Sequence, residues 1–61
     1  MYYLLIYHYS DQTVSLEWLS YTDYTKREVI AHAHEQRVMI GSGCEFIEVA
    51  LCDVSKFDIV S

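Results

Sequence analysis

The chain has 61 residues, of which 52% are hydrophobic, 15% aromatic and 21% charged, and it contains no proline. A chain of this length supports one hydrophobic core, and its large apolar fraction excludes an intrinsically disordered protein, so we expect a single domain over residues 1–61. The net charge is −5, with only four Lys and Arg. This balance argues against direct nucleic-acid binding, because affinity for phosphate depends on basic side chains.

The first predicted element is a strand over residues 2–9, where nearly every side chain is aromatic or aliphatic. This stretch is too short to cross a bilayer, and it lacks the basic start and the small-residue cleavage site of a signal peptide. We therefore expect a cytoplasmic protein that does not enter a membrane. Ser10, Asp11 and Gln12 form a polar break, which predicts a turn into a second, antiparallel strand over residues 13–21.

A helix is predicted to begin near Thr25, because Thr25 and Glu28 have the spacing of a capping box. Gly41 suits the left-handed residue that closes a helix. Between these ends, a narrow side at helical spacing carries Val29, Ile30, Ala33, Arg37 and Ile40. Val38 and Met39 lie off that side, and we expect them either to begin irregular chain early or to contact a partner. The helix is thus predicted to cover one face of a sheet and to leave its own other side in water.

A third strand is predicted over residues 44–52, where apolar and polar positions alternate after a turn at residues 41–43. Residues 54–61 are predicted to form either a short edge strand or a helical turn. The order strand, strand, helix, strand predicts an α+β fold. We expect a three- to four-stranded, mainly antiparallel sheet with one helix packed on one face.

The first strand is apolar on both faces, and one helix cannot cover both. We expect the helix to cover the face that carries Leu4, Ile6, Val14, Leu16, Trp18, Ile47, Val49 and Leu51. The opposite face is then predicted to bind a partner through Tyr3, Tyr7, Tyr9, Tyr21, Phe46, Glu17 and Glu48. Tyrosine suits such a face because its ring is large and rigid while its hydroxyl stays hydrated. One alternative is that the C-terminal tail folds back over this face, and another is that these tyrosines are only strand formers on an exposed face.

The predicted function is a small acidic protein-interaction module without catalytic activity or cofactor, acting as an inhibitor or an accessory subunit. Its predicted partner is another protein or a second copy of this chain, which would give a homodimer. The acidity either confers solubility or imitates a nucleic-acid backbone, as in small phage inhibitors of nucleic-acid-handling proteins.

The alternative function is a small enzyme or metal-binding protein that uses His32, His34 and a cysteine. Two helical residues at this spacing point about 200° apart, so His32 and His34 cannot share one metal ion on a helix. Cys44 and Cys52 give no disulfide framework, and we expect both to be small buried side chains.

Overall fold

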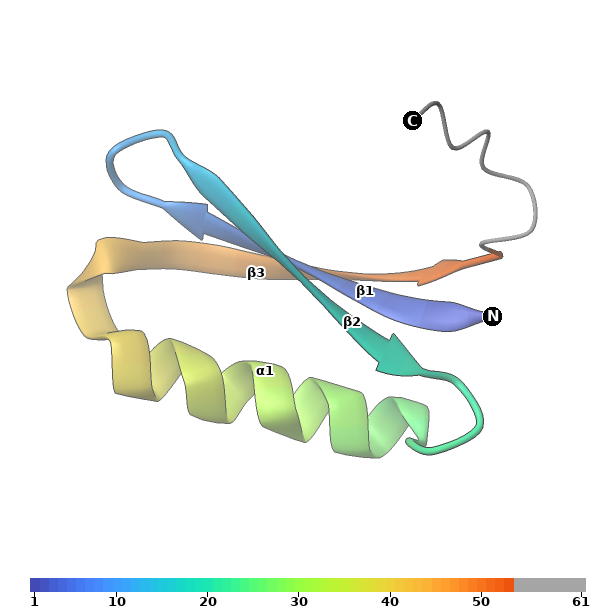
Figure 1. The fold of residues 1–61 in the computed structure, drawn as a ribbon. Helices are drawn as coiled ribbons and strands as arrows, with labels where there is room; N and C mark the ends of the chain where they lie inside the picture. Colours follow the sequence, from blue (N-terminus) through green and yellow to red (C-terminus); the bar gives the residue numbers. More distant parts are fainter. Residues whose placement is uncertain (54–61) are drawn as a thin grey trace, which may run out of the picture.

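A computed structural model describes residues 1–53, and it consists of a three-stranded antiparallel sheet and one helix. In chain order the elements are β1 (Tyr2–Tyr9), β2 (Val14–Ser20), α1 (Lys26–Ile40), the single 3-10 turn η1 (Gly41–Gly43) and β3 (Cys44–Cys52). Strand β1 lies in the middle of the sheet, between β2 and β3 (Figure 1). The predicted α+β fold with β-β-α-β order is therefore confirmed. The element predicted at 54–61 lies outside the described residues.

The turn between β1 and β2 is stabilised by its own polar residues. The Asp11 carboxylate accepts a hydrogen bond from the Thr13 amide at 3.0 Å, which is the local contact that favours Asp in turns. Gln12 adopts a left-handed conformation with φ of 70°, and its amide donates to the Tyr9 carbonyl at 3.0 Å. The polar break at residues 10–12 thus ends the first strand as predicted.

The helix begins and ends at the predicted residues. The Thr25 hydroxyl accepts from the Glu28 amide at 3.2 Å, and the Glu28 carboxylate accepts from the Thr25 amide at 3.0 Å. This reciprocal capping box satisfies two amides that the first turn leaves without partners. At the other end Gly41 has a φ of 78°, and its amide donates to the Arg37 carbonyl. Glycine adopts this conformation without the steric cost of a Cβ.

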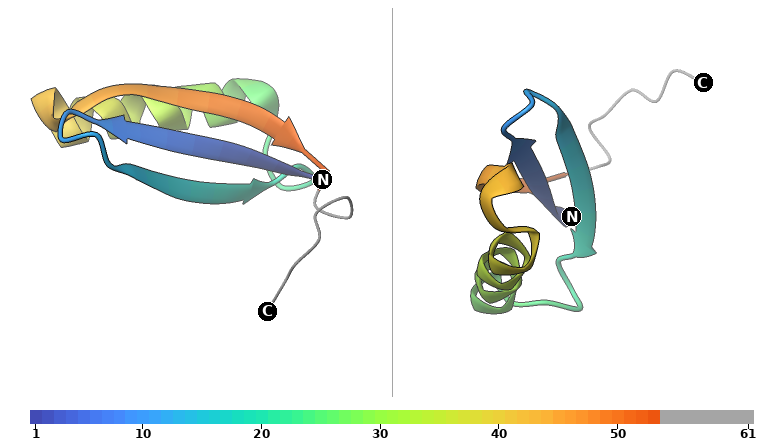
Figure 2. Two further views of the ribbon diagram at one scale, coloured as in Figure 1. Left: turned by 90° about the horizontal axis from the view of Figure 1, so that it is seen from above. Right: turned by 90° about the vertical axis from the view of Figure 1, so that its left-hand side faces the viewer.

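The core lies between α1 and one face of the sheet, which we call the covered face. Its buried side chains are Tyr3, Leu5, Tyr7, Val29, Ala33 and Cys44. The three strand-β1 members pair across the sheet with Leu51, Val49 and Ile47 of β3, so all of these residues share the covered face. Tyr9, Leu19 and Ile47 are partly buried against the same cluster. Figure 2 shows α1 on this side of the sheet only.

The predicted orientation of the first two strands is wrong. Tyr3 and Tyr7, predicted to face a partner, are only 7% and 6% exposed in the core, whereas Leu4 and Ile6 lie on the opposite face. Val14, Leu16 and Trp18 of β2, also predicted to meet the helix, are exposed on that opposite face. Side chains alternate with a period of two, so an error of one residue in phase exchanges the two faces of a strand.

The sequence does not determine which face of β1 meets the helix, because both faces of this strand are apolar. Strand β3 carries the predicted set Ile47, Val49 and Leu51 on the covered face. On the helix, Val29 and Ala33 are buried, but Ile30 and Ile40 remain more than a third exposed. The helix therefore uses a narrower side than the sequence predicts. Val38 and Met39 are exposed but still belong to α1, so the prediction that irregular chain begins there is wrong, while a partner contact at these residues stays a prediction.

Two valines of α1 provide a matched test of this packing. Val29 is 0% exposed and Val38 is 82% exposed. We expect Val29→Ala to lower the free energy of unfolding by about 2 kcal/mol, because it removes buried methyl groups and leaves a cavity. Val38→Ala should change it by less than about 0.5 kcal/mol. Urea unfolding followed by circular dichroism measures both values, and equal losses would contradict the assigned packing.

Candidate functional site

The face of the sheet that points away from α1, which we call the open face, is formed by side chains from all three strands. Strand β1 places four residues along its middle, and the registers with β2 and β3 set the flanking residues beside them. The open face consists of Tyr2, Leu4, Ile6, His8, Val14, Leu16, Trp18, Ser20, Phe46, Glu48, Ala50 and Cys52. Among the described residues no helix or strand is layered over it (Figure 2).

The open face is a continuous apolar surface. Leu16 and Val14 are each 56% exposed, Phe46 is 48% exposed and Trp18 is 46% exposed. These four side chains and Tyr2 together expose on the order of 500 Å², given that one large aromatic side chain presents 150–250 Å² when free. An apolar patch of this size is comparable to the largest patches on monomeric proteins, and such patches are often functional.

Two ring contacts hold the aromatic side chains of the open face in fixed positions. Tyr2 and Trp18 meet edge to face, with ring centroids 6.3 Å apart and planes at 90°. His8 and Phe46 are stacked, with centroids 4.2 Å apart and an interplanar angle of 15°. Both arrangements are favourable for aromatic rings. Side chains that such contacts already order would lose less conformational entropy if another surface covered them.

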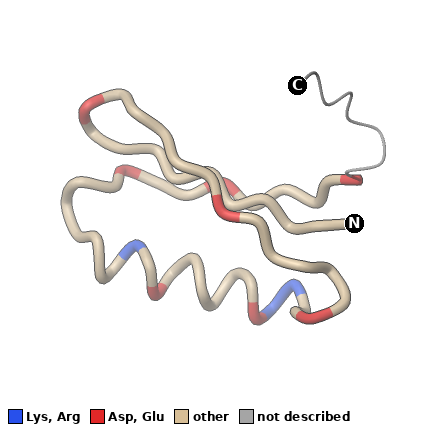
Figure 3. Tube along the Cα trace, in the orientation of Figure 1, with Lys and Arg blue, Asp and Glu red and all other residues tan. Residues whose placement is uncertain are grey.

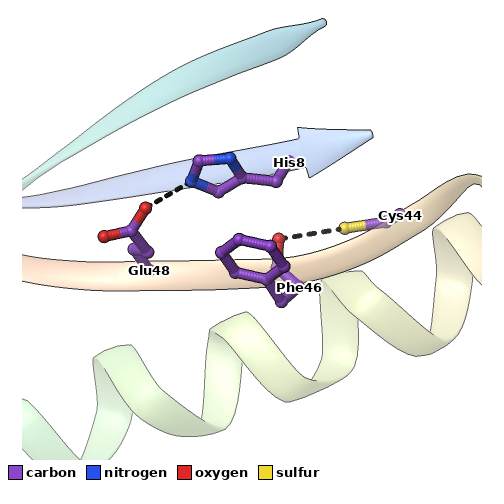
Figure 4. A network of polar contacts seen from close by, with 4 residues as sticks. All are labelled: His8, Cys44, Phe46 and Glu48. Carbon is purple, nitrogen blue, oxygen red and sulfur yellow. Dashed lines mark hydrogen bonds and ion pairs between the residues drawn. The ribbon is translucent and has the colours of Figure 1, made fainter. Parts of the chain in front are cut away.

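The open face carries a single carboxylate, and that carboxylate has its partner in the same chain. Glu48 of β3 pairs with the His8 imidazole of β1, beside the stacked Phe46 ring (Figure 4). The open face contains no Lys or Arg. The open face is therefore mainly apolar, and its one carboxylate already has a hydrogen-bond partner in the same chain.

On the covered face, a second polar group joins three elements. The Tyr7 hydroxyl of β1 donates to the Glu17 carboxylate of β2 at 2.6 Å, and His32 of α1 lies 2.9 Å from the same oxygen. Burial, with the hydrogen bond and charge of Glu17, raises the pKa of Tyr7 well above its ordinary value of 10.0. Burial also raises the pKa of Glu17, but the hydrogen bonds from Tyr7 and His32 outweigh it and lower that pKa below 4.5.

Because the pKa of Tyr7 is raised and that of Glu17 is lowered, both groups keep their ordinary charge states at neutral pH. Tyr7 stays protonated and Glu17 stays ionised, so the hydrogen bond between them is charge-assisted. The contact joins β2 to both β1 and α1. Glu17, predicted as a partner contact, therefore has a structural role inside the domain.

The predicted site residues are divided between the two faces. Tyr3 and Tyr7 belong to the core, and Tyr9 is partly buried against it while its hydroxyl contacts the Ser15 hydroxyl at 2.7 Å. Tyr21 lies on the same side as Tyr3, with ring centroids 5.7 Å apart, and is itself exposed. Only Phe46 and Glu48 lie on the open face. The expectation that all seven residues share one uncovered face is therefore corrected.

Sequence reasoning missed the apolar residues that dominate the open face, above all Leu16 and Trp18. In β2 the alternation places Val14, Leu16 and Trp18 opposite Ser15, Glu17 and Leu19, and the more apolar set is normally the buried one. The structure reverses this rule. Glu17 is accommodated on the covered face because Tyr7 and His32 both hydrogen-bond to it. A partner for Glu17 on the helix was the signal that could have revealed the orientation.

The two histidines of the alternative metal or enzyme hypothesis point to different surroundings. His32 contacts Glu17, whereas His34 is exposed in a shallow hollow beside Arg37 and Glu45. Within residues 1–53 no group of three or more His, Cys, Asp or Glu side chains is placed to hold a metal ion. Cys44 and Cys52 begin and end β3, and both are free thiols, with Cys44 buried and Cys52 partly exposed.

Comparisons of the chain with models of protein families, with curated proteins and with solved structures find no match. In the part of the chain that the structure describes, no helix combines the length and the apolar character needed to cross a membrane.

Two tyrosines of β1 provide a test of the Glu17 contact. We expect Tyr7→Phe to lower the free energy of unfolding by about 1 kcal/mol, because it removes a charge-assisted hydrogen bond in a partly buried setting. Tyr9→Phe is the matched control, since its hydroxyl bonds to an exposed serine, and it should cost less than about 0.5 kcal/mol. Chemical unfolding at neutral pH measures both, and an equal or larger cost for Tyr9→Phe would contradict the assigned role of Glu17.

The lowered pKa of Glu17 predicts a dependence of stability on pH. A carboxyl group whose folded pKa lies below its unfolded value of 4.5 stabilises the fold above that value. This contribution is lost as the pH falls through the folded pKa, and Asp11 and Glu28, whose pKa values are also lowered, act in the same direction. Glu17→Gln should therefore lose less stability than the wild type between about pH 7 and about pH 3.

The matched control for this prediction is Glu35→Gln, which removes a carboxylate that lines the same hollow as Glu17 and His32. Its acid-induced loss of stability should follow the wild type. Unfolding by urea at each pH gives the comparison. If Glu17→Gln and the wild type lose equal stability on acidification, Glu17 does not have the ionised, hydrogen-bonded role described.

Proposed function

We propose that this protein is a non-enzymatic protein-interaction module, an accessory or inhibitory subunit that docks through the open face. The observation that carries the proposal is the exposed apolar surface built by all three strands, over which no helix or strand of residues 1–53 is layered. Leu16, Trp18 and Phe46 are its most prominent side chains. A few well-buried side chains, most often Trp, Tyr and Arg, supply most of the binding free energy in protein interfaces. Here Trp and Tyr side chains are ordered on a rigid sheet.

The chemistry of the open face favours a protein partner over nucleic acid. Sheet-based binders of single strands combine stacking aromatic rings with a basic groove for the phosphates. The open face offers stacking rings but no Lys or Arg, and the whole chain has a net charge of −5. An apolar protein surface matches it better.

The charges lie mostly outside the open face. Carboxylates are spread over the hairpin turn, the sheet and the helix rather than gathered in one stripe (Figure 3). This distribution supports a role in solubility and in repelling nucleic acid. Inhibition of a partner, including a nucleic-acid-handling protein of the kind that phage inhibitors target, would then follow from occupying its apolar surface and not from charge mimicry.

Two further features support a non-enzymatic role in the cytoplasm. The Tyr7–Glu17–His32 contact ties the domain together, and its groups are already engaged with one another. The two cysteines are free thiols, a state that the reducing cytoplasm maintains.

A photo-crosslinking experiment tests the docking role. A photoreactive phenylalanine analogue is placed at Leu16 on the open face or at Val38 on the outer side of α1, both of which are exposed. In native lysate we expect irradiation to give discrete protein adducts from position 16 and none from position 38. An adduct with a second copy of this chain counts as much as one with a foreign protein.

If position 16 gives no adduct at all, or the same adducts as position 38, the open face is not a docking surface.

A further inference from the structure

We propose that the occupant of the open face is a second copy of this chain, packed face to face about a two-fold axis that runs parallel to β1. The inference rests on the proposed docking role of the open face and names its partner. The product is a four-layered dimer in which the two sheets lie inside and the two helices outside.

The area of the open face is sufficient for a stable dimer. Its five most exposed apolar side chains present on the order of 500 Å². The other residues of the open face are also partly or fully exposed, among them Glu48, whose side chain is 54% exposed. The total approaches the roughly 800 Å² per partner that a standard specific interface buries.

The polar groups of the open face are compatible with a copy of itself. Glu48 is paired with His8 within each chain, so two copies meet without bringing an unpaired carboxylate to the interface. A basic foreign partner would meet only this one carboxylate on the open face, and His8 already contacts it. Among residues 1–53 the remaining acidic side chains lie outside the open face, which limits repulsion between two chains that each carry −5.

The sizes of the side chains across the sheet select the direction of the axis. One row across the strands runs Trp18, Leu4, Ala50, and another runs Val14, His8, Phe46. An axis parallel to β1 lays β2 of one chain over β3 of the other. Trp18 then lies over the partner's Ala50, and Phe46 lies over the partner's Val14. Large side chains meet small ones in both rows, as close packing requires.

The same axis lays Leu16 over the partner's Glu48, because Leu16, Ile6 and Glu48 share the row between the other two. Within one chain Leu16 and Glu48 are separated by two strand spacings, about 9–10 Å. A charge introduced at position 16 therefore acts on Glu48 mainly across the dimer. The sign of that charge becomes a probe of the arrangement.

The experiment is sedimentation equilibrium of the full chain and of matched variants at neutral pH, with circular dichroism as a control for folding. We expect the wild type to be a dimer. Leu16→Glu should weaken dimerisation by about 100-fold or more, because it sets like charges together twice across the axis. Leu16→Lys removes the same leucine but introduces the opposite charge, and it should dimerise at least about 10-fold more tightly than Leu16→Glu.

Three controls complete the test. Val38→Glu, on the outer side of α1, should leave the dimer unchanged. Glu48→Gln should not weaken the dimer by itself, and combined with the two Leu16 variants it should abolish the difference between them. Leu16→Thr, which keeps a strand-forming residue, should also weaken the dimer and replaces any Leu16 variant that fails to fold.

Three results would overturn the inference. A monomeric wild type excludes a second copy as the occupant, while adducts of foreign proteins at position 16 would still support the docking role. A dimer that all Leu16 variants retain at wild-type strength places the interface elsewhere, such as at the free edge of β2 or β3. Equal weakening by Leu16→Glu and Leu16→Lys would contradict the axis that places Leu16 over Glu48.

Discussion

The packing of α1 on one face of a three-stranded sheet is the constraint on which the other features depend. Val29 and Ala33 of the helix are buried against Tyr3, Leu5 and Tyr7 of the central strand, and this contact forms the core. One helix cannot also cover the second face, although β1 is apolar on both sides. The burial of Tyr3, Leu5 and Tyr7 therefore leaves Leu4 and Ile6, with their neighbours in β2 and β3, on an open apolar face.

The polar contact at Glu17 explains why the sheet accepts this orientation. In β2 the covered face carries Glu17 where the open face carries Leu16 and Trp18, the reverse of ordinary burial. The Tyr7 hydroxyl and His32 hydrogen-bond to this carboxylate, so the covered face tolerates its charge. The more apolar set of β2 therefore lies on the open face, where it is exposed and available to the proposed partner.

Local signals in the sequence were sufficient to predict the helix and the strands. The faces of β1 and β2 that meet the helix depend on long-range contacts, and they could not be predicted. The capping box of Thr25 and Glu28, the closing Gly41 and the polar break after Tyr9 each act within a few residues, and all three predictions are confirmed. The phase of β1 depends on which face meets the helix. A strand that is apolar at successive positions contains no signal for this choice, so Tyr3 and Tyr7 were assigned to the wrong face.

The most direct test of the central claim is which methyl groups of β1 contact the helix. Nuclear Overhauser effects between Val29 and the strand, measured on methyl-labelled protein, report this without any substitution. The structure predicts strong effects from Val29 to Leu5 and to the Tyr7 ring, and none to Leu4 or Ile6. Effects from Val29 to Leu4 and Ile6 would mean that the helix covers the other face, and the open face described here would not exist.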